Sequence, residues 1–140
     1  MSKLSFLICL FLFALTQSVT QKAVVDCVRK QLGKPYVYGA AGPNSFDCSG
    51  LAYYCHGNAI PRTASAQAYG SGKTIGKNSV QPGDLMFWNT MGDGVGHTTI
   101  CSGSGKMIHA PTSGQNVKEV TYKGNNYWEP KFVTAKRYWS

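Results

Sequence analysis

The chain has 140 residues and a formal net charge of +8, from fourteen Lys and Arg against six Asp and Glu. Its length suits one compact domain and leaves little room for a second. The basic balance favours anionic partners, namely bacterial wall polymers, nucleic acid or acidic membrane. The basic residues are scattered without a run of five or six, so a nucleic-acid-binding arm is not expected.

Residues 1–20 are typical of a secretory signal peptide. Lys3 gives a short basic start, and residues 4–15 form an almost unbroken apolar run that is shorter than the ~20 residues a membrane-spanning helix needs. Fairly small residues precede a plausible cleavage site near Gln21. An N-terminal anchor or a buried helix is the alternative. The interpretation predicts a secreted protein, extracellular or associated with the cell wall, whose single domain covers residues 21–140.

Three helical segments are predicted in the first half of the domain. Residues 23–32 predict a helix that Gly33 and Pro35 end, and residues 49–55 predict a second one. A short helical segment is expected within residues 61–69. The apolar face of the first helix is predicted to hold Val24, Cys27, Val28 and Leu32.

Strands dominate the second half of the predicted domain. The sequence from Gln81 to Asp84 reads as a turn, in which Asp84 has a structural role. The strand candidates are residues 85–88, 95–101, 106–110, 117–122 and 132–138. Because helices come first and strands later, the sequence predicts an α+β fold rather than an alternating parallel one.

Four cysteines fall within residues 21–140, at Cys27, Cys48, Cys55 and Cys101. Export would permit disulfides, and at most one pair can form if Cys48 stays free. Small buried thiols are expected for most of them. No Cys-x-x-Cys pair exists, so neither a structural metal site nor a cofactor is expected.

Cys48 and two histidines supply the residues of a thiol hydrolase. Cys48 lies at the start of a predicted helix, where the helix dipole should stabilise a thiolate and lower the thiol pKa. Free backbone N–H groups there could bind an oxyanion. His97 and His109 lie twelve positions apart on strand candidates with a Gly-Ser-Gly between them, as in a hairpin. One imidazole could then act as the base while the other orients it.

Six stretches, in the same order, resemble the NlpC/P60 cysteine peptidases, and together they cover essentially all of residues 21–140. They are residues 33–39 (GKPYVYG), 46–51 (FDCSGL), 61–64 (PRTA) with Gln67, 81–87 (QPGDLMF), 96–97 (GH) and 105–110 (GKMIHA). The resemblance implies a papain-like fold, with a helix that carries the nucleophile packed on an antiparallel sheet. It also implies hydrolysis of amide bonds in peptidoglycan stem peptides, commonly between γ-D-glutamate and a diamino acid.

The resemblance also implies roles for individual residues. Cys48 matches the nucleophile, His97 the general base and His109 the orienting residue. Tyr36 matches a tyrosine that lines the site and helps to hold the oxyanion. The positions that match stem-peptide contacts are Asp47, Ser49 and Arg62. Asp47 can also cap the helix.

Two departures from the family pattern and two alternatives stay open. Thr98 to Cys101 replace the usual Val-Gly-Ile-Tyr after the first histidine, although β-branched Thr suits a strand. No wall-binding SH3-like or LysM module is expected in this chain, and the protein is expected to be a monomer. The alternatives are a catalytically silent wall-binding or inhibitory protein, and a papain-like amidase or acyltransferase. His56 is expected to have a structural role at the end of the Cys48 helix.

Overall fold

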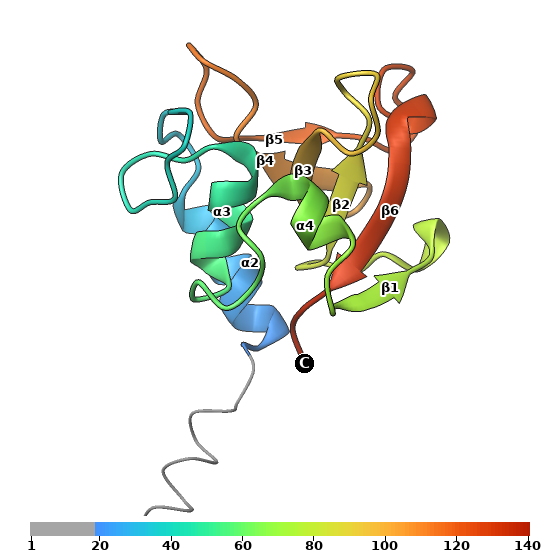
Figure 1. The fold of residues 1–140 in the computed structure, drawn as a ribbon, viewed down its shortest axis with the longest axis horizontal. Helices are drawn as coiled ribbons and strands as arrows, with labels where there is room; N and C mark the ends of the chain where they lie inside the picture. Colours follow the sequence, from blue (N-terminus) through green and yellow to red (C-terminus); the bar gives the residue numbers. More distant parts are fainter. Residues whose placement is uncertain (1–18) are drawn as a thin grey trace, which may run out of the picture.

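The computed structural model describes residues 19–140, and the predicted signal peptide, residues 1–20, lies outside this part except for its last two residues. Helices come first in the described chain and an antiparallel sheet follows, as the α+β prediction requires (Figure 1). The α-helices are α2 (Gln21–Lys30), α3 (Cys48–Cys55) and α4 (Ala64–Ala68). The strands are β1 (Lys73–Ile75), β2 (Leu85–Trp88), β3 (His97–Gly103), β4 (Lys106–His109), β5 (Lys118–Thr121) and β6 (Phe132–Arg137). Two short 3₁₀ helices cover Lys77–Ser79 and Glu129–Lys131.

The sheet has the strand order β1-β6-β2-β3-β4-β5, and every neighbouring pair is antiparallel. The C-terminal strand β6 therefore lies between β1 and β2. All predicted strands form, whereas β1 was not predicted. It is short and polar, and Ile75 is its only buried residue, so its pairing with β6 rather than its own sequence fixes it.

Helix α2 begins and ends two residues earlier than the sequence predicts. The Thr20 hydroxyl caps it by accepting the N–H of Ala23 at 3.1 Å, which fixes the start. Val24 and Val28 are buried as predicted, one turn apart. The predicted burial of Leu32 is wrong, because the helix has ended before this residue, whose side chain is 40% exposed.

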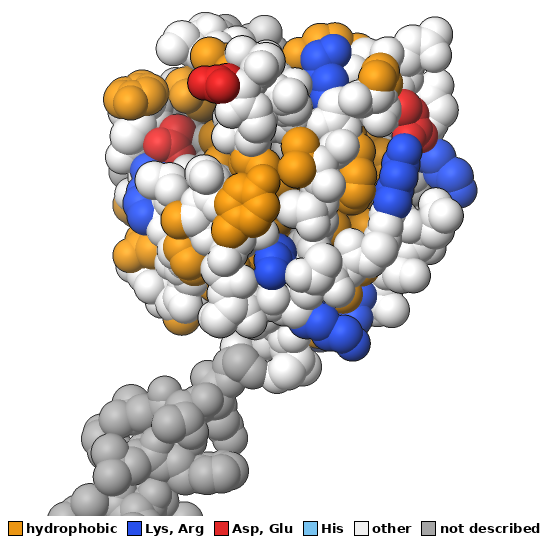
Figure 2. Space-filling model, turned by 45° about the vertical axis from the view of Figure 1, so that its right-hand side comes forward, with side chains coloured by type: hydrophobic (Ala, Val, Ile, Leu, Met, Phe, Trp, Pro, Cys, Tyr) orange, Lys and Arg blue, Asp and Glu red, His pale blue; other side chains and the backbone are white. Residues whose placement is uncertain are grey.

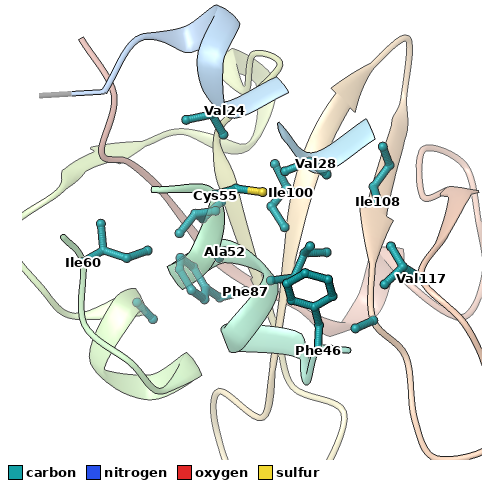
Figure 3. Packing of buried hydrophobic residues seen from close by; sticks show 14 residues of the cluster. Val24, Val28, Phe46, Ala52, Cys55, Ile60, Phe87, Ile100, Ile108 and Val117 are labelled. Carbon is teal, nitrogen blue, oxygen red and sulfur yellow. The ribbon is translucent and has the colours of Figure 1, made fainter. Parts of the chain in front are cut away.

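The two faces of the sheet carry separate apolar clusters. Leu85 and Phe87 of β2 face the helices, while Met86 and Trp88 face the other side, as the alternation of a strand requires. On the helical side, residues of α2 and α3 pack against Phe87 and strands β3 and β4 (Figure 3). This packing holds α3 across β3, and β3 begins at His97.

A disulfide joins Cys27 of α2 to Cys55 of α3, so the expectation of small buried thiols is wrong for these two residues. Their spacing in the sequence gives no sign of the pairing, which depends on how the two helices pack. Cys48 and Cys101 remain free thiols. The cross-link closes a loop of 28 residues, which stabilises the fold by about 3 to 4 kcal/mol through the entropy of the unfolded chain.

Asp84 stabilises a turn, as the sequence predicts. It also forms an ion pair that the sequence does not predict. One carboxylate oxygen accepts the N–H of Gln81 at 2.8 Å, which closes the turn before β2. The fully buried carboxylate also accepts two hydrogen bonds from Arg137 of β6, each at 2.8 Å. The turn before β2 and the C-terminal strand β6 are thus held together.

The surface of the described chain carries dispersed positive charge. Figure 2 shows Lys and Arg side chains at separate places over one face of the molecule rather than in one patch. Among the helices of residues 19–140, none has the length and apolar character needed to cross a membrane. The same residues contain no cluster of three His, Cys, Asp or Glu side chains placed to hold a metal ion.

Candidate active site

Cys48 is the first residue of α3, one position before the predicted start, and Asp47 is its N-cap. A carboxylate oxygen of Asp47 accepts the N–H of Gly50 at 2.6 Å, which confirms the predicted cap. Gly50 is required because a Cβ there would lie 2.1 Å from the carbonyl oxygen of Ala40. The local sequence Asp-Cys-Ser-Gly therefore fixes where the helix begins and places Cys48 at its end.

Arg62 lies against this helix start. Its guanidinium donates to the Asp47 carboxylate at 2.8 and 3.1 Å and to the hydroxyl of Ser49 at 2.9 Å. The hydrogen bond to Asp47 raises the pKa of Arg62 further above its usual range. The structure thus brings together the three residues predicted to contact substrate, and it shows that Asp47 and Arg62 also neutralise one another.

These three residues, Cys48 and Tyr36 share one pocket of about 630 Å³. Its lining consists of Tyr36, Tyr38, Gly39, Asp47, Cys48, Ser49, Arg62, Thr63, Ala64, Met91 and Gly96. Burial raises the pKa of the Tyr36 hydroxyl, and the nearby Cys48 and Asp47 raise it further. Tyr36 is therefore a neutral hydrogen-bond donor beside the cysteine at neutral pH.

The two histidines lie next to each other at one end of the sheet. His97 begins β3 and His109 ends β4, on adjacent antiparallel strands as predicted. The Nε2 atom of His97 lies 2.8 Å from the Nδ1 atom of His109. Burial lowers the pKa of His97 to about 4; burial, together with the neighbouring His97, lowers that of His109 to about 3. Both imidazoles are therefore neutral at pH 7.

Cys48 lies close to the residues that flank His97. Gly96 lines the same pocket as Cys48, and the backbone of Thr98 lies near enough to the sulfur to act on the pKa of the thiol. The predicted lowering of the thiol pKa is wrong. Burial raises the pKa of Cys48, Asp47 adds to the increase, and the hydrogen bonds from backbone N–H groups only partly oppose it. The resting cysteine is a neutral thiol because desolvation outweighs the helix end.

Trp128 packs on both histidines, a contact that no feature of the sequence predicts. Its indole stacks on His97 at a centroid distance of 5.9 Å and meets His109 edge to face at 5.5 Å. Trp128 follows β5 by seven residues in a loop, so only the folded chain brings it to the pair. It shields the imidazoles from solvent and restricts the orientation of their rings.

Gln67 connects the cysteine helix to the histidine strand. Its side chain is fully buried and donates to the carbonyl oxygens of Ser49 and Pro61 at 3.0 and 2.9 Å. Its carbonyl oxygen accepts the hydroxyl of Thr98 at 3.0 Å. These bonds fix α3 relative to the start of β3. The sequence showed Gln67 only as part of a motif.

His56 lies at the other end of α3, where a structural role was predicted. Its Nδ1 atom lies 2.8 Å from the carbonyl oxygen of Ala52, so this nitrogen carries the proton and donates to the helix end. Burial lowers the pKa of His56. A neutral N–H group, not an imidazolium, therefore caps the last turn.

The chain is similar in sequence to known proteins. The sequence model of the NlpC/P60 family matches residues 33–137. Murein DD-endopeptidase MepH of Escherichia coli is 35% identical over 123 residues, covering 83% of this chain and 45% of that protein. Gamma-DL-glutamyl hydrolase of Bacillus subtilis is 33% identical over 121 residues, covering 82% of this chain and 29% of that protein.

The fold is also found among solved structures. NlpC1 from Trichomonas vaginalis superposes with a TM-score of 0.78 and 30% identity, covering 86% of this chain and 44% of that chain. The protein therefore spans less than half the length of these three relatives. Because the family match covers residues 33–137 and includes both the cysteine helix and the histidine strands, the chain belongs to the NlpC/P60 family.

Proposed function

We propose that this protein is a secreted cysteine endopeptidase that hydrolyses an amide bond in peptidoglycan stem peptides, between γ-D-glutamate and a diamino acid. The observation that carries the proposal is that Gly96, the residue before His97, lines the pocket of Cys48, while His97 itself forms a buried pair with His109. Family membership supports the wall substrate. One relative is named a gamma-DL-glutamyl hydrolase and another a DD-endopeptidase, so the bond is the point to test.

In the proposed acylation step, Cys48 and His97 both start neutral. As the sulfur attacks the carbonyl carbon, its proton passes to Nδ1 of His97 and negative charge moves to the carbonyl oxygen. That oxygen accepts hydrogen bonds from backbone N–H groups at the start of α3 and from Tyr36. The imidazolium then gives the proton to the departing amine as the C–N bond breaks, which leaves a thioester on Cys48.

In deacylation, His97 takes a proton from water and returns a proton to the sulfur of Cys48. Water loses a proton to His97 while its oxygen attacks the thioester carbon. The C–S bond breaks, the proton returns to sulfur, and the carboxylic acid product leaves. Throughout the cycle, the Nε2–H of His97 donates to Nδ1 of His109, which fixes the imidazole and leaves Nδ1 of His97 free to act as the base. His109 is thus an orienting residue.

The proposed acyl-side contacts use the charged wall of the Cys48 pocket. Arg62 and Asp47 present a cation and an anion side by side, with Ser49 between them. A stem peptide offers a carboxylate and an amine close to its γ-glutamyl bond, so this pair can bind both ends with little net charge change. Binding exchanges part of the Asp47–Arg62 ion pair for substrate contacts.

Mass spectrometry of peptidoglycan fragments, before and after incubation with the purified protein, tests the proposal. The expected products carry a new amine on the diamino acid and a free γ-carboxylate on glutamate. Cys48→Ala should abolish the products, whereas Cys101→Ala, which removes the other free thiol of residues 19–140, should leave them. Products that arise only from cleavage between two D-residues would show that the protein hydrolyses a bond other than the proposed one. No products at all would refute the proposed activity.

Three further parts of the proposal concern the whole chain. Residues 1–20 act as a cleaved signal peptide, residues 21–140 form the catalytic domain, and this domain works as a monomer without a nucleic-acid partner. N-terminal sequencing of protein recovered from the culture medium tests the first part, with a new N-terminus expected near Gln21. Retention of Met1 in the exported protein would contradict it.

A further inference from the structure

A second pocket adjoins the histidine pair, apart from the one that contains Cys48. It has a volume of about 320 Å³. Its wall includes both histidines, three apolar or aromatic side chains and one cation: His97, His109, Val120, Tyr127, Trp128 and Lys118. Arg62, Asp47 and Ser49, which form the charged wall of the Cys48 pocket, do not line this second pocket. The histidine pair thus lines a space whose chemistry differs from that of the Cys48 pocket.

His109 has one ring nitrogen that nothing in the described chain satisfies. Its Nδ1 faces His97, while its Nε2 is buried, points away from His97 and has no hydrogen-bond partner. A base at Nδ1 of His97 requires the proton of that ring on Nε2, which donates to Nδ1 of His109. The proton of neutral His109 must then lie on Nε2. The same tautomer that serves the chemistry therefore leaves an unpaired, buried donor on a residue that lines the pocket.

Lys118 supplies the charge of this pocket. It is the register partner of His109 on β5, and its ammonium donates to the amide oxygen of Gln115 at 2.8 Å. Of the described residues that line the pocket, Lys118 is the only one with a charged side chain. The next residue, Glu119, points to the other face of the sheet, where it pairs with Ser102 and Arg29. No carboxylate therefore competes for Lys118 within the pocket lining.

We propose that this pocket is the binding site for the amine side of the substrate, and that it selects a residue carrying a free carboxylate. The inference rests on the proposed function, because the departing amine must receive its proton from His97, which borders this pocket. The aliphatic part of the residue packs against Trp128, Tyr127 and Val120. Its carboxylate accepts hydrogen bonds from Lys118 and, after a small ring movement, from the unpaired N–H of His109.

The test compares two tripeptides that end in the same diamino acid after γ-D-glutamate, one as the free acid and one as the C-terminal carboxamide. Wild-type protein should cleave the free acid about tenfold more efficiently in kcat/KM, mainly through KM. Lys118→Met should reduce this preference to near unity, and Lys118→Arg should restore most of it. Lys106→Met, an exposed lysine on β4 outside the pocket, should keep the wild-type preference while it removes the same charge.

The outcomes separate the two proposals. Equal cleavage of both tripeptides by the wild-type protein, or an unchanged preference in Lys118→Met, would overturn the carboxylate pocket and leave the endopeptidase proposal standing. An equal loss of the preference for the free acid in Lys118→Met and Lys106→Met would show that the effect comes from net charge. This result would also overturn the proposal of a carboxylate-binding pocket. Cleavage of neither tripeptide by the wild-type protein, at the level of Cys48→Ala, would overturn the endopeptidase proposal and the pocket with it.

Discussion

Cys48, His97 and His109 are all buried enough to favour their neutral forms, which distinguishes this site from a resting thiolate–imidazolium pair. Desolvation raises the pKa of the thiol and lowers those of both imidazoles. The proton must then move during the attack of sulfur on the carbonyl rather than before it. A substrate that excludes water strengthens every hydrogen bond in this transfer.

The pH dependence of activity should reflect the lowered pKa of His97. The base is neutral at pH 7 and is protonated only as the pH falls through about 4, so kcat/KM should stay high to well below pH 6.5 and then drop with a midpoint near 4. Initial rates on a soluble stem peptide between pH 3 and 8 would show this. A midpoint near 6.5 would indicate a solvated imidazole and contradict the burial described here.

Folding must be followed in the same pH range. The unfolded histidines take up protons from about pH 6.5 downward, whereas the folded pair does not. The free energy of unfolding should therefore decrease as the pH falls from 6.5 toward 4. Circular dichroism at each pH, with chemical denaturation, separates loss of fold from protonation of His97.

Tyr36 offers a second residue-scale test. If its neutral hydroxyl donates to the oxyanion, Tyr36→Phe should lower kcat by about 10²-fold with little change in KM, because the bond forms in the transition state. Tyr38→Phe is the matched control, since Tyr38 lines the same pocket but is 88% exposed. Steady-state kinetics on one soluble substrate is the measurement. Equal, small effects in the two variants would assign Tyr36 to packing.

At the scale of elements, α3 is held at both ends and along its side. Asp47 and Arg62 fix its start, and Gln67 ties its first turn to β3. At its far end, Cys55 is cross-linked to Cys27 of α2. Cys55 lies seven residues from Cys48, which is about 10 Å along a helix. The stabilising cross-link and the reactive thiol therefore occupy opposite ends of one element.

Removal of the disulfide should affect stability much more than chemistry. The double variant Cys27→Ala, Cys55→Ala should lose about 3 kcal/mol of unfolding free energy. It should retain most of the wild-type kcat on a soluble peptide at 25 °C, because the contacts of Cys48 are intact. Urea denaturation and initial rates are the two measurements. As a control, dithiothreitol should lower the midpoint of the wild-type protein and leave the double variant unchanged; an unaffected wild-type midpoint would show that the bond is absent in solution.

For the whole molecule, the net charge acts over longer distances than the contacts within the Cys48 pocket. Only one of the basic residues, Lys3, precedes residue 21, so residues 21–140 carry a formal charge of +7. Lys and Arg side chains lie at separate places over one face of the molecule (Figure 2), so we expect a general attraction for anionic material rather than binding at one patch of that face. The pocket contacts around Cys48, by contrast, act over single hydrogen-bond distances.

Binding to whole wall material should therefore weaken markedly as sodium chloride rises, since exposed charges are screened within about 8 Å at physiological ionic strength. Hydrolysis of a soluble stem peptide should change much less over the same range. Sedimentation of Cys48→Ala with purified sacculi, beside peptide kinetics at each salt concentration, measures both. Salt-insensitive sedimentation would show that contacts in the groove, not net charge, hold the protein on the wall.

The sequence by itself determined the local features of the site. The Asp-Cys-Ser-Gly spacing encodes a capped helix start because a cap acts over three residues. Strand alternation and the short Gly-Ser-Gly turn encode the β3–β4 hairpin that pairs His97 with His109. The helices and all strands except β1 could thus be predicted from the spacing of residues, whereas the shared location of Asp47, Ser49 and Arg62 was implied only by the resemblance to the family.

Only the tertiary structure decided the features that depend on burial and on distant partners. The pairing of Cys27 with Cys55 and the stacking of Trp128 on His97 join segments that are far apart in the chain. The placement of Lys118 in the same pocket as His109 depends on the register between β4 and β5. The protonation state of Cys48 also depended on the tertiary structure. A helix dipole can be inferred from sequence and predicts a lower pKa, but desolvation depends on everything packed around the sulfur, and here desolvation is the larger effect.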